Sequence, residues 1–194
     1  MPSQNYQNQA LRDLSWMIHS PALLALGDYP QYQNLSLADK LPAEELAHWL
    51  AALDQEPDAL LGYIAALPSP RLGIYFEGLC QFFFAHYPGF ELLAHNLQVN
   101  QVEPRQTLGE FDMLVGYEGE TWHIEAAVKF YLGTGTNDSQ WIGPNVIDNL
   151  ARKAGHLFGH QLALGDSDEG KARLVEAEIA PIKKRYLWVC GYLF

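Results

Sequence analysis

Apolar positions in the first half of the chain recur at the three- and four-residue spacing of a helix face. The clearest case is the segment 71–87, where aromatic and aliphatic side chains return at that spacing (Leu72, Tyr75, Phe76, Leu79, Phe83 and Phe84). The same reasoning predicts helices over 6–19, over 57–66 and from Leu41 to about Leu53, where Pro42 and two acids mark the start. The first seventy residues are therefore predicted to be mainly helical.

After Pro88-Gly89 the pattern changes to short runs rich in β-branched and aromatic residues. We expect strands over 90–99, 111–117, 121–132 and 185–194, and a helix over 145–164. The sequence Tyr117-Glu118-Gly119-Glu120 predicts a hairpin turn between the second and third strands. This order of elements predicts an α/β (α+β) fold, in which a sheet core carries a helical N-terminal elaboration.

The length of 194 residues and the hydrophobic content of 48% favour a single domain over 1–194, with the elaboration in 1–70 and the core in 71–194. Neither a leader pattern nor an apolar run long enough for a bilayer is evident, so we expect a cytoplasmic protein with no membrane contact. Cys80 and Cys190 lie in apolar runs, which predicts two buried thiols and excludes a zinc site made of cysteines.

The net charge of −11 counts against a protein that binds long nucleic acids through a broad basic face. A local basic groove remains compatible with an acidic exterior. The residues available for such a groove are Arg71, Lys129, Arg152, Lys153 and the run Lys183-Lys184-Arg185.

Three charged residues interrupt the apolar strands of the predicted hairpin. Asp112 stands near the start of one strand, and Glu125 and Lys129 stand in the other. A buried charge is costly unless it is paired or binds a metal. Because side chains alternate along a strand, Glu125, Ala127 and Lys129 should project to one face. Two carboxylates and an ammonium can then share one surface of the sheet.

Such a set suits metal-assisted phosphodiester chemistry. Carboxylate oxygens bind Mg²⁺ or Mn²⁺, the metal activates a water, and a lysine stabilises charge on the phosphate. Asp112 would bind the metal, Glu125 the metal or the water, and Lys129 the nucleophile or phosphate. Glu110 is either a further ligand or a solvated strand end. The alternative is a structural ion pair between Lys129 and one of the two carboxylates.

At these residues the sequence resembles the PD-(D/E)XK phosphodiesterase superfamily and, more closely, the bacterial family called domain of unknown function 1853. The resemblance spans most of the chain. It is carried by Leu11-Arg12-Asp13-Leu14-Ser15-Trp16, Arg71-Leu72-Gly73-Ile74-Tyr75-Phe76-Glu77, Gly109-Glu110-Phe111-Asp112, Glu125-Ala126-Ala127-Val128-Lys129-Phe130-Tyr131-Leu132 and Gly159-His160-Gln161-Leu162.

The resemblance implies a restriction-endonuclease-like core, a central mixed sheet flanked by helices. Asp112 and Lys129 would match the first aspartate and the lysine of the superfamily motif, and Glu77 a helix glutamate beside the metal. The motif places its second acid two residues before the lysine, where this chain has Ala127. Glu125 stands four residues before Lys129, about 13 Å away along the strand.

The sequence therefore predicts a Mg²⁺-dependent phosphodiesterase or nuclease with a displaced second acid and a nucleic acid substrate. The predicted metal ligands are Asp112, Glu125, Glu77 and Glu110. The alternatives are a catalytically degenerate nuclease fold that binds nucleic acid or a protein partner, and an unrelated protein with a structural ion pair. The predicted helix 145–164 also carries a polar stripe, Asn149, Lys153, His156 and His160, which is either a phosphate-facing surface or a solvated face.

Overall fold

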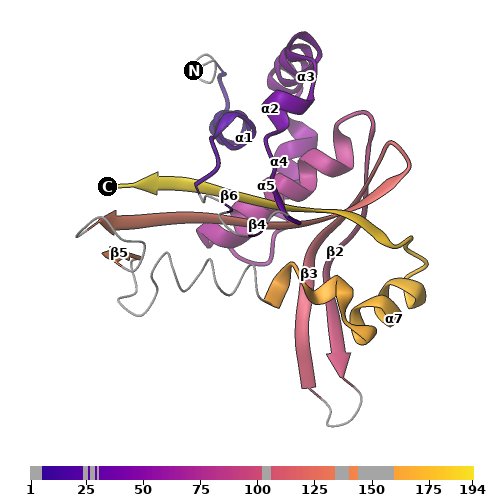
Figure 1. The fold of residues 1–194 in the computed structure, drawn as a ribbon. Helices are drawn as coiled ribbons and strands as arrows, with labels where there is room; N and C mark the ends of the chain where they lie inside the picture. Colours follow the sequence, from indigo (N-terminus) through magenta and orange to yellow (C-terminus); the bar gives the residue numbers. More distant parts are fainter. Residues whose placement is uncertain are drawn as a thin grey trace.

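A computed structural model shows a mixed β-sheet with helices packed on it (Figure 1). The structure describes residues 6–23, 26, 29, 31–101, 106–133, 140–143 and 160–194. Among these residues, every helix is too short or too polar to span a bilayer.

Among the described residues, five helices precede the main strands. They are α1 (Gln9–His19), α2 (Leu37–Lys40), α3 (Ala43–Gln55), α4 (Asp58–Ala65) and α5 (Leu72–His86). The Asn8 side chain caps α1 by accepting the Ala10 N–H. Helix α5 is buried along most of its length because its apolar residues surround it almost completely.

The strands run in the order β1-β6-β4-β3-β2, and β5 pairs with β4 off this path. Their bounds are β1 (Gln33–Asn34), β2 (Phe90–Gln101), β3 (Gln106–Tyr117), β4 (Glu120–Gly133), β5 (Trp141–Ile142) and β6 (Ile182–Leu193). Strands β2, β3 and β4 form an antiparallel meander, whereas β6 is parallel to β4 and β1 is parallel to β6. The sheet is therefore mixed.

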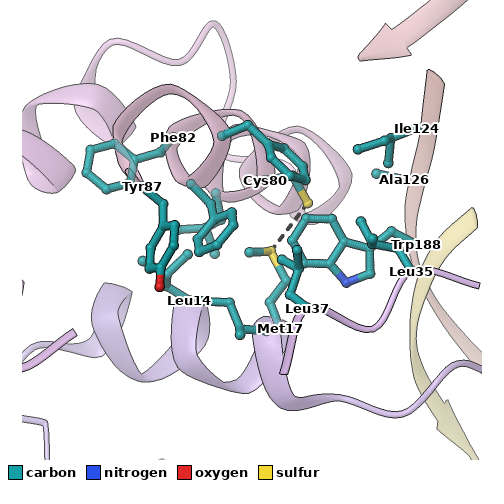
Figure 2. Packing of buried hydrophobic residues seen from close by; sticks show 14 of the residues in the cluster. Leu14, Met17, Leu35, Leu37, Cys80, Phe82, Tyr87, Ile124, Ala126 and Trp188 are labelled. Carbon is teal, nitrogen blue, oxygen red and sulfur yellow. Dashed lines mark hydrogen bonds between the residues drawn. The ribbon is translucent and has the colours of Figure 1, made fainter. Parts of the chain in front are cut away.

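The main hydrophobic core lies between one face of this sheet and helices α1–α5. Leu14 and Met17 of α1, Cys80 of α5 and Trp188 of β6 are all buried in it (Figure 2). The Cys80 thiol contacts the Met17 sulfur at 3.3 Å. Both cysteines are free and buried, as the sequence predicted.

The other face of the sheet holds two smaller clusters. In one cluster, Leu162 packs with Tyr131, Leu187 and Val189. In the other, Leu164 packs with Val99 of β2 and with Phe111 and Leu114 of β3. The segment 160–166, which ends in a 3₁₀ helix (Leu164–Asp166), therefore crosses this face from β6 to β3. It leads into α7 (Asp168–Glu176).

The predicted fold class, a mixed sheet flanked by helices with a helical N-terminal half, is confirmed. The predicted hairpin turn is present, with Glu118 at φ 50° and Gly119 at φ 77°. Asp112 lies in the middle of β3 and not near a strand start, because β3 begins at Gln106. The sequence reading missed α2 and α7. Most of the predicted helix 145–164 lies outside the described residues, and residues 160–163 lead into the 3₁₀ helix that begins at Leu164.

Candidate functional site

The pairing between strands β3 and β4 ends next to Asp112. Their backbones pair from Tyr117 and Glu120 as far as Met113 and Ile124, and beyond this point β3 pairs only with β2 while β4 continues beside β6. Figure 1 shows the two strands diverging. At the fork, the Asp112 carboxylate accepts the Ala126 N–H at 3.0 Å. The Asp112 side chain thus satisfies a backbone donor that has lost its partner strand.

Glu125 projects to the sheet face away from the large core. Its neighbours Ile124 and Ala126 belong to the helix-side core, whereas Ala127 packs with the cluster on the opposite face. Strand alternation therefore puts Glu125, Ala127 and Lys129 on one face, as the sequence analysis expected. Glu125 is fully buried there.

His123 holds the Glu125 carboxylate from the same strand. Its Nε2 lies 2.7 Å from Glu125 Oε1, and both side chains are fully buried. Burial lowers the pKa of His123 to about 3, so the imidazole is neutral. Placing its proton on Nε2 lets the ring donate to the carboxylate. Phe111 packs edge-on against the imidazole and fixes its plane.

Asp112 and Glu125 form a carboxyl pair across the fork. Burial, and next the negative charge of Glu125, raise the pKa of Asp112 to about 8. The Ala126 N–H and His123 oppose this rise only in part. At neutral pH the pair therefore retains a proton, which a divalent cation could replace.

Lys129 is half-buried on β4, four residues beyond Glu125 on a continuous strand. Its backbone lies beside Gly191 of β6. The strand places Lys129 about 13 Å from Glu125 along the chain direction, so the two side chains must lean together to share one ligand.

Of the two further predicted ligands, Glu77 lies on α5, and Glu110 lies on β3 two residues before Asp112. Glu77 is half-buried on α5, where its charge and that of Asp112 both raise the pKa of the Cys80 thiol, although burial is the largest cause. Glu110 is half-buried on β3 opposite Gln98 of β2. Within the described ranges, no three His, Cys, Asp or Glu side chains come close enough to hold a metal ion. The predicted set of four ligands is thus not preassembled, and the carboxyl pair is what remains of it.

The described basic residues that were proposed for a groove lie on separate elements. Arg71 precedes α5, and the run Lys183–Arg185 follows Ile182, the first residue of β6. Lys184 pairs with Glu120 at 2.7 Å, and Arg185 pairs with Asp166 at 2.5 Å. Arg152 and Lys153, together with the polar stripe Asn149, Lys153 and His156, lie outside the described residues. His160 lies near Gly109 of β3.

His123 is the site residue that the sequence reading missed. The available signal was a histidine two residues before Glu125 in an apolar strand, since that spacing puts both side chains on one face. The spacing predicts a shared face, and the structure shows that the two side chains are in contact there.

Two comparisons with known proteins, one with curated sequences and one with solved structures, found no match. The comparison with protein families did find one, and it covers nearly the whole chain, including both arms of the fork. The chain belongs to the family described as domain of unknown function (DUF1853), whose model matches residues 12–194.

Proposed function

We propose that this protein is a divalent-metal-dependent phosphodiesterase that acts on nucleic acid. The observation that carries the proposal is the carboxyl pair of half-buried Asp112 and fully buried Glu125, at the fork between β3 and β4. A carboxyl pair with a raised pKa in a partly buried site is typical of functional sites. The resemblance of the segments around Asp112 and Lys129 to the PD-(D/E)XK superfamily supports the same reading.

The residues present fit Mg²⁺ or Mn²⁺. These ions prefer carboxylate oxygens, and Mg²⁺ commonly uses one or two carboxylates together with waters and substrate phosphates. A carboxyl pair without a third protein ligand is compatible with this coordination of Mg²⁺. When bound, the metal would supply charge to polarise the phosphodiester and activate a water.

The chain's own residues have separate roles in this proposal. Asp112 and Glu125 hold the metal, and His123 fixes the orientation of Glu125 through its 2.7 Å contact. Lys129 stabilises negative charge on the phosphate. Substrate approach along β4, between Glu125 and Lys129, would bring a phosphate between carboxylates and ammonium.

The decisive experiment measures metal binding and cleavage in the same variants. Isothermal titration with Mn²⁺ should show a site in the wild type that is lost in Asp112→Asn. Asp58→Asn is the matched control, because it makes the same change on the exposed first turn of α4. Cleavage of bis(p-nitrophenyl) phosphate and of labelled DNA and RNA should require Mg²⁺ or Mn²⁺. Full cleavage by Lys129→Ala would refute the role given to that lysine.

A second candidate is a degenerate nuclease fold that binds nucleic acid or a protein without cleaving. Ala127 at the motif's acid position, the net charge of −11 and the missing third ligand among the described residues favour it. It predicts that the protein has no Mn²⁺ site. It also predicts that Asp112→Asn binds the nucleic acid or protein partner as tightly as the wild type does. Tight Mn²⁺ binding lost in Asp112→Asn would rule it out.

A further inference from the structure

A cavity of about 600 Å³ lies on the opposite side of β4 from Lys129. Val128 and Phe130 of β4 line it, and they alternate with the residues that carry the carboxyl site. The other walls come from α1, α5 and β6. The proposed phosphodiesterase site does not use this cavity.

Aromatic rings from four elements surround the cavity. They are Trp16 of α1, Tyr75 and Phe76 of α5, Phe130 of β4 and Tyr192 of β6. Two ring pairs are stacked. The ring centroids of Trp16 and Tyr192 are 5.7 Å apart, with an interplanar angle of 23°. Those of Phe130 and Tyr192 are 6.1 Å apart, with an angle of 21°. These rings therefore form a row with nearly parallel planes, which one further planar ring can extend.

Polar contacts keep the walls in place. The Trp16 indole N–H donates to the Tyr192 hydroxyl at 2.8 Å, and the Tyr75 hydroxyl donates to Asp13 at 2.8 Å. Arg12 donates to the backbone carbonyls of Tyr6 and Gln7. The polar groups around the cavity are thus engaged in fixing its shape, as in a preformed ligand pocket.

The mouth of the cavity exposes apolar surface. Leu72 is 52% exposed and Tyr192 is 48% exposed, and both line the cavity. Large apolar side chains left in water at a cavity mark a surface whose burial by a ligand is favourable. The volume lies within the range of about 300–1,000 Å³ that is usual for sites of small molecules.

We propose that this cavity binds a small planar aromatic molecule by ring stacking. An aliphatic ligand would bury the same surface but could not extend the stacked row. The inference does not depend on the proposed phosphodiesterase activity, because the two sites use opposite faces of β4.

The test is isothermal titration with 2-naphthol and with decahydro-2-naphthol, which has the same carbon skeleton without aromatic rings. We expect one 2-naphthol site per chain and at least fivefold weaker binding of the saturated analogue. Tyr192→Leu should weaken 2-naphthol binding at least fivefold, because it keeps apolar bulk but removes a ring from the row. Asp112→Asn should leave the affinity unchanged.

Phe194→Leu is the matched control. Phe194 is exposed and is not part of the cavity lining, and its ring is tilted by 36° against that of Tyr192, so it does not belong to the row of nearly parallel rings. This change should therefore alter the affinity less than twofold. Absence of 2-naphthol binding, equal binding of the two probes, or equal losses in Tyr192→Leu and Phe194→Leu would each overturn the proposal.

Discussion

Three ionisable side chains lie together where β3 leaves β4: His123 and Glu125 are fully buried, and Asp112 is half-buried. Their burial opposes charge on each of them, and it raises the pKa of Asp112 to about 8 while lowering that of His123 to about 3. At neutral pH the carboxyl pair therefore keeps one proton, and the imidazole of His123 is neutral with a single N–H. In the proposed function, a cation would take the place of the proton on the carboxyl pair.

Stability should fall as pH rises from about 6.5 to about 8. The folded pKa of Asp112 lies above its ordinary value of 3.8, so the folded state holds a proton that the unfolded chain releases. His123 acts in the opposite sense, but only below its ordinary pKa of 6.5. One group contributes a slope of at most about 1.4 kcal/mol per pH unit.

Chemical denaturation across this pH range checks the expectation. Asp112→Asn cannot titrate at this position, so its free energy of unfolding should be flatter between pH 6.5 and 8 than that of the wild type. Asp58→Asn, on the exposed first turn of α4, should keep the wild-type fall. An Asp112→Asn curve parallel to the wild type would mean that Asp112 is already ionised.

Metal binding should stabilise the protein more at pH 8.5 than at pH 6. A cation bound only by the folded state raises the free energy of unfolding, and at pH 6 it competes with the proton on the carboxyl pair. Scanning calorimetry with 10 mM Mg²⁺ should show the larger rise in Tm at the higher pH. A pH-independent rise, or the same rise in Asp112→Asn, would place the ion elsewhere.

At the scale of elements, the parallel pairing of β4 with β6 holds Lys129 in place. Gly191 of β6 has φ 148°, and a side chain there would overlap the carbonyl oxygen of Lys129. Only glycine accommodates both the conformation and the close approach. The contact fixes the β4 backbone at the residue that carries the proposed phosphate-binding ammonium.

Gly191→Ala should therefore lower the free energy of unfolding by roughly 2 kcal/mol or more. The control is Gly62→Ala in α4, where an added methyl group meets no atom within 4 Å. That change should stabilise the protein by about 0.5–1 kcal/mol, because alanine is the better helix former. Urea denaturation measures both. Equal effects of the two substitutions would contradict the packing at β6.

At the scale of the whole molecule, the N-terminal helices and the sheet share one core. Leu11, Leu14 and Met17 of α1 are fully buried in the cluster that contains Trp122 and Trp188 of the sheet. Figure 2 shows Leu14 and Met17 of α1 on one side of the cluster and Cys80 and Phe82 of α5 on the other, with Trp188 beside Cys80. We therefore expect the segments 1–70 and 71–194 to unfold together.

Leu14→Ala should lower the free energy of unfolding by about 2–5 kcal/mol, because it leaves a cavity in this shared core. Circular dichroism reports the helices, and tryptophan fluorescence reports both layers. The two signals should keep a common midpoint in the variant. Separate midpoints would show that the helical half is an independent unit.

The helices and the hairpin were predictable because their signals are local. The three-and-four spacing in α5 and the turn at Glu118-Gly119 depend only on neighbours in the chain. The short helix α2 and the polar helix α7 escaped prediction, since four residues give little periodicity and α7 buries only Gly170 and Leu174. Asp112, Glu125 and Lys129 could be singled out, because charges within apolar strands are conspicuous.

The sequence by itself determined the helical half, the antiparallel hairpin and the face of β4 that carries Glu125 and Lys129, since strand alternation follows from covalent geometry. Tertiary structure alone decided that β3 leaves β4 at Asp112 and that segment 160–166 crosses the face holding Glu125. These features depend on contacts between segments far apart in the chain. Burial, and with it the pKa of Asp112, arises only when those segments meet.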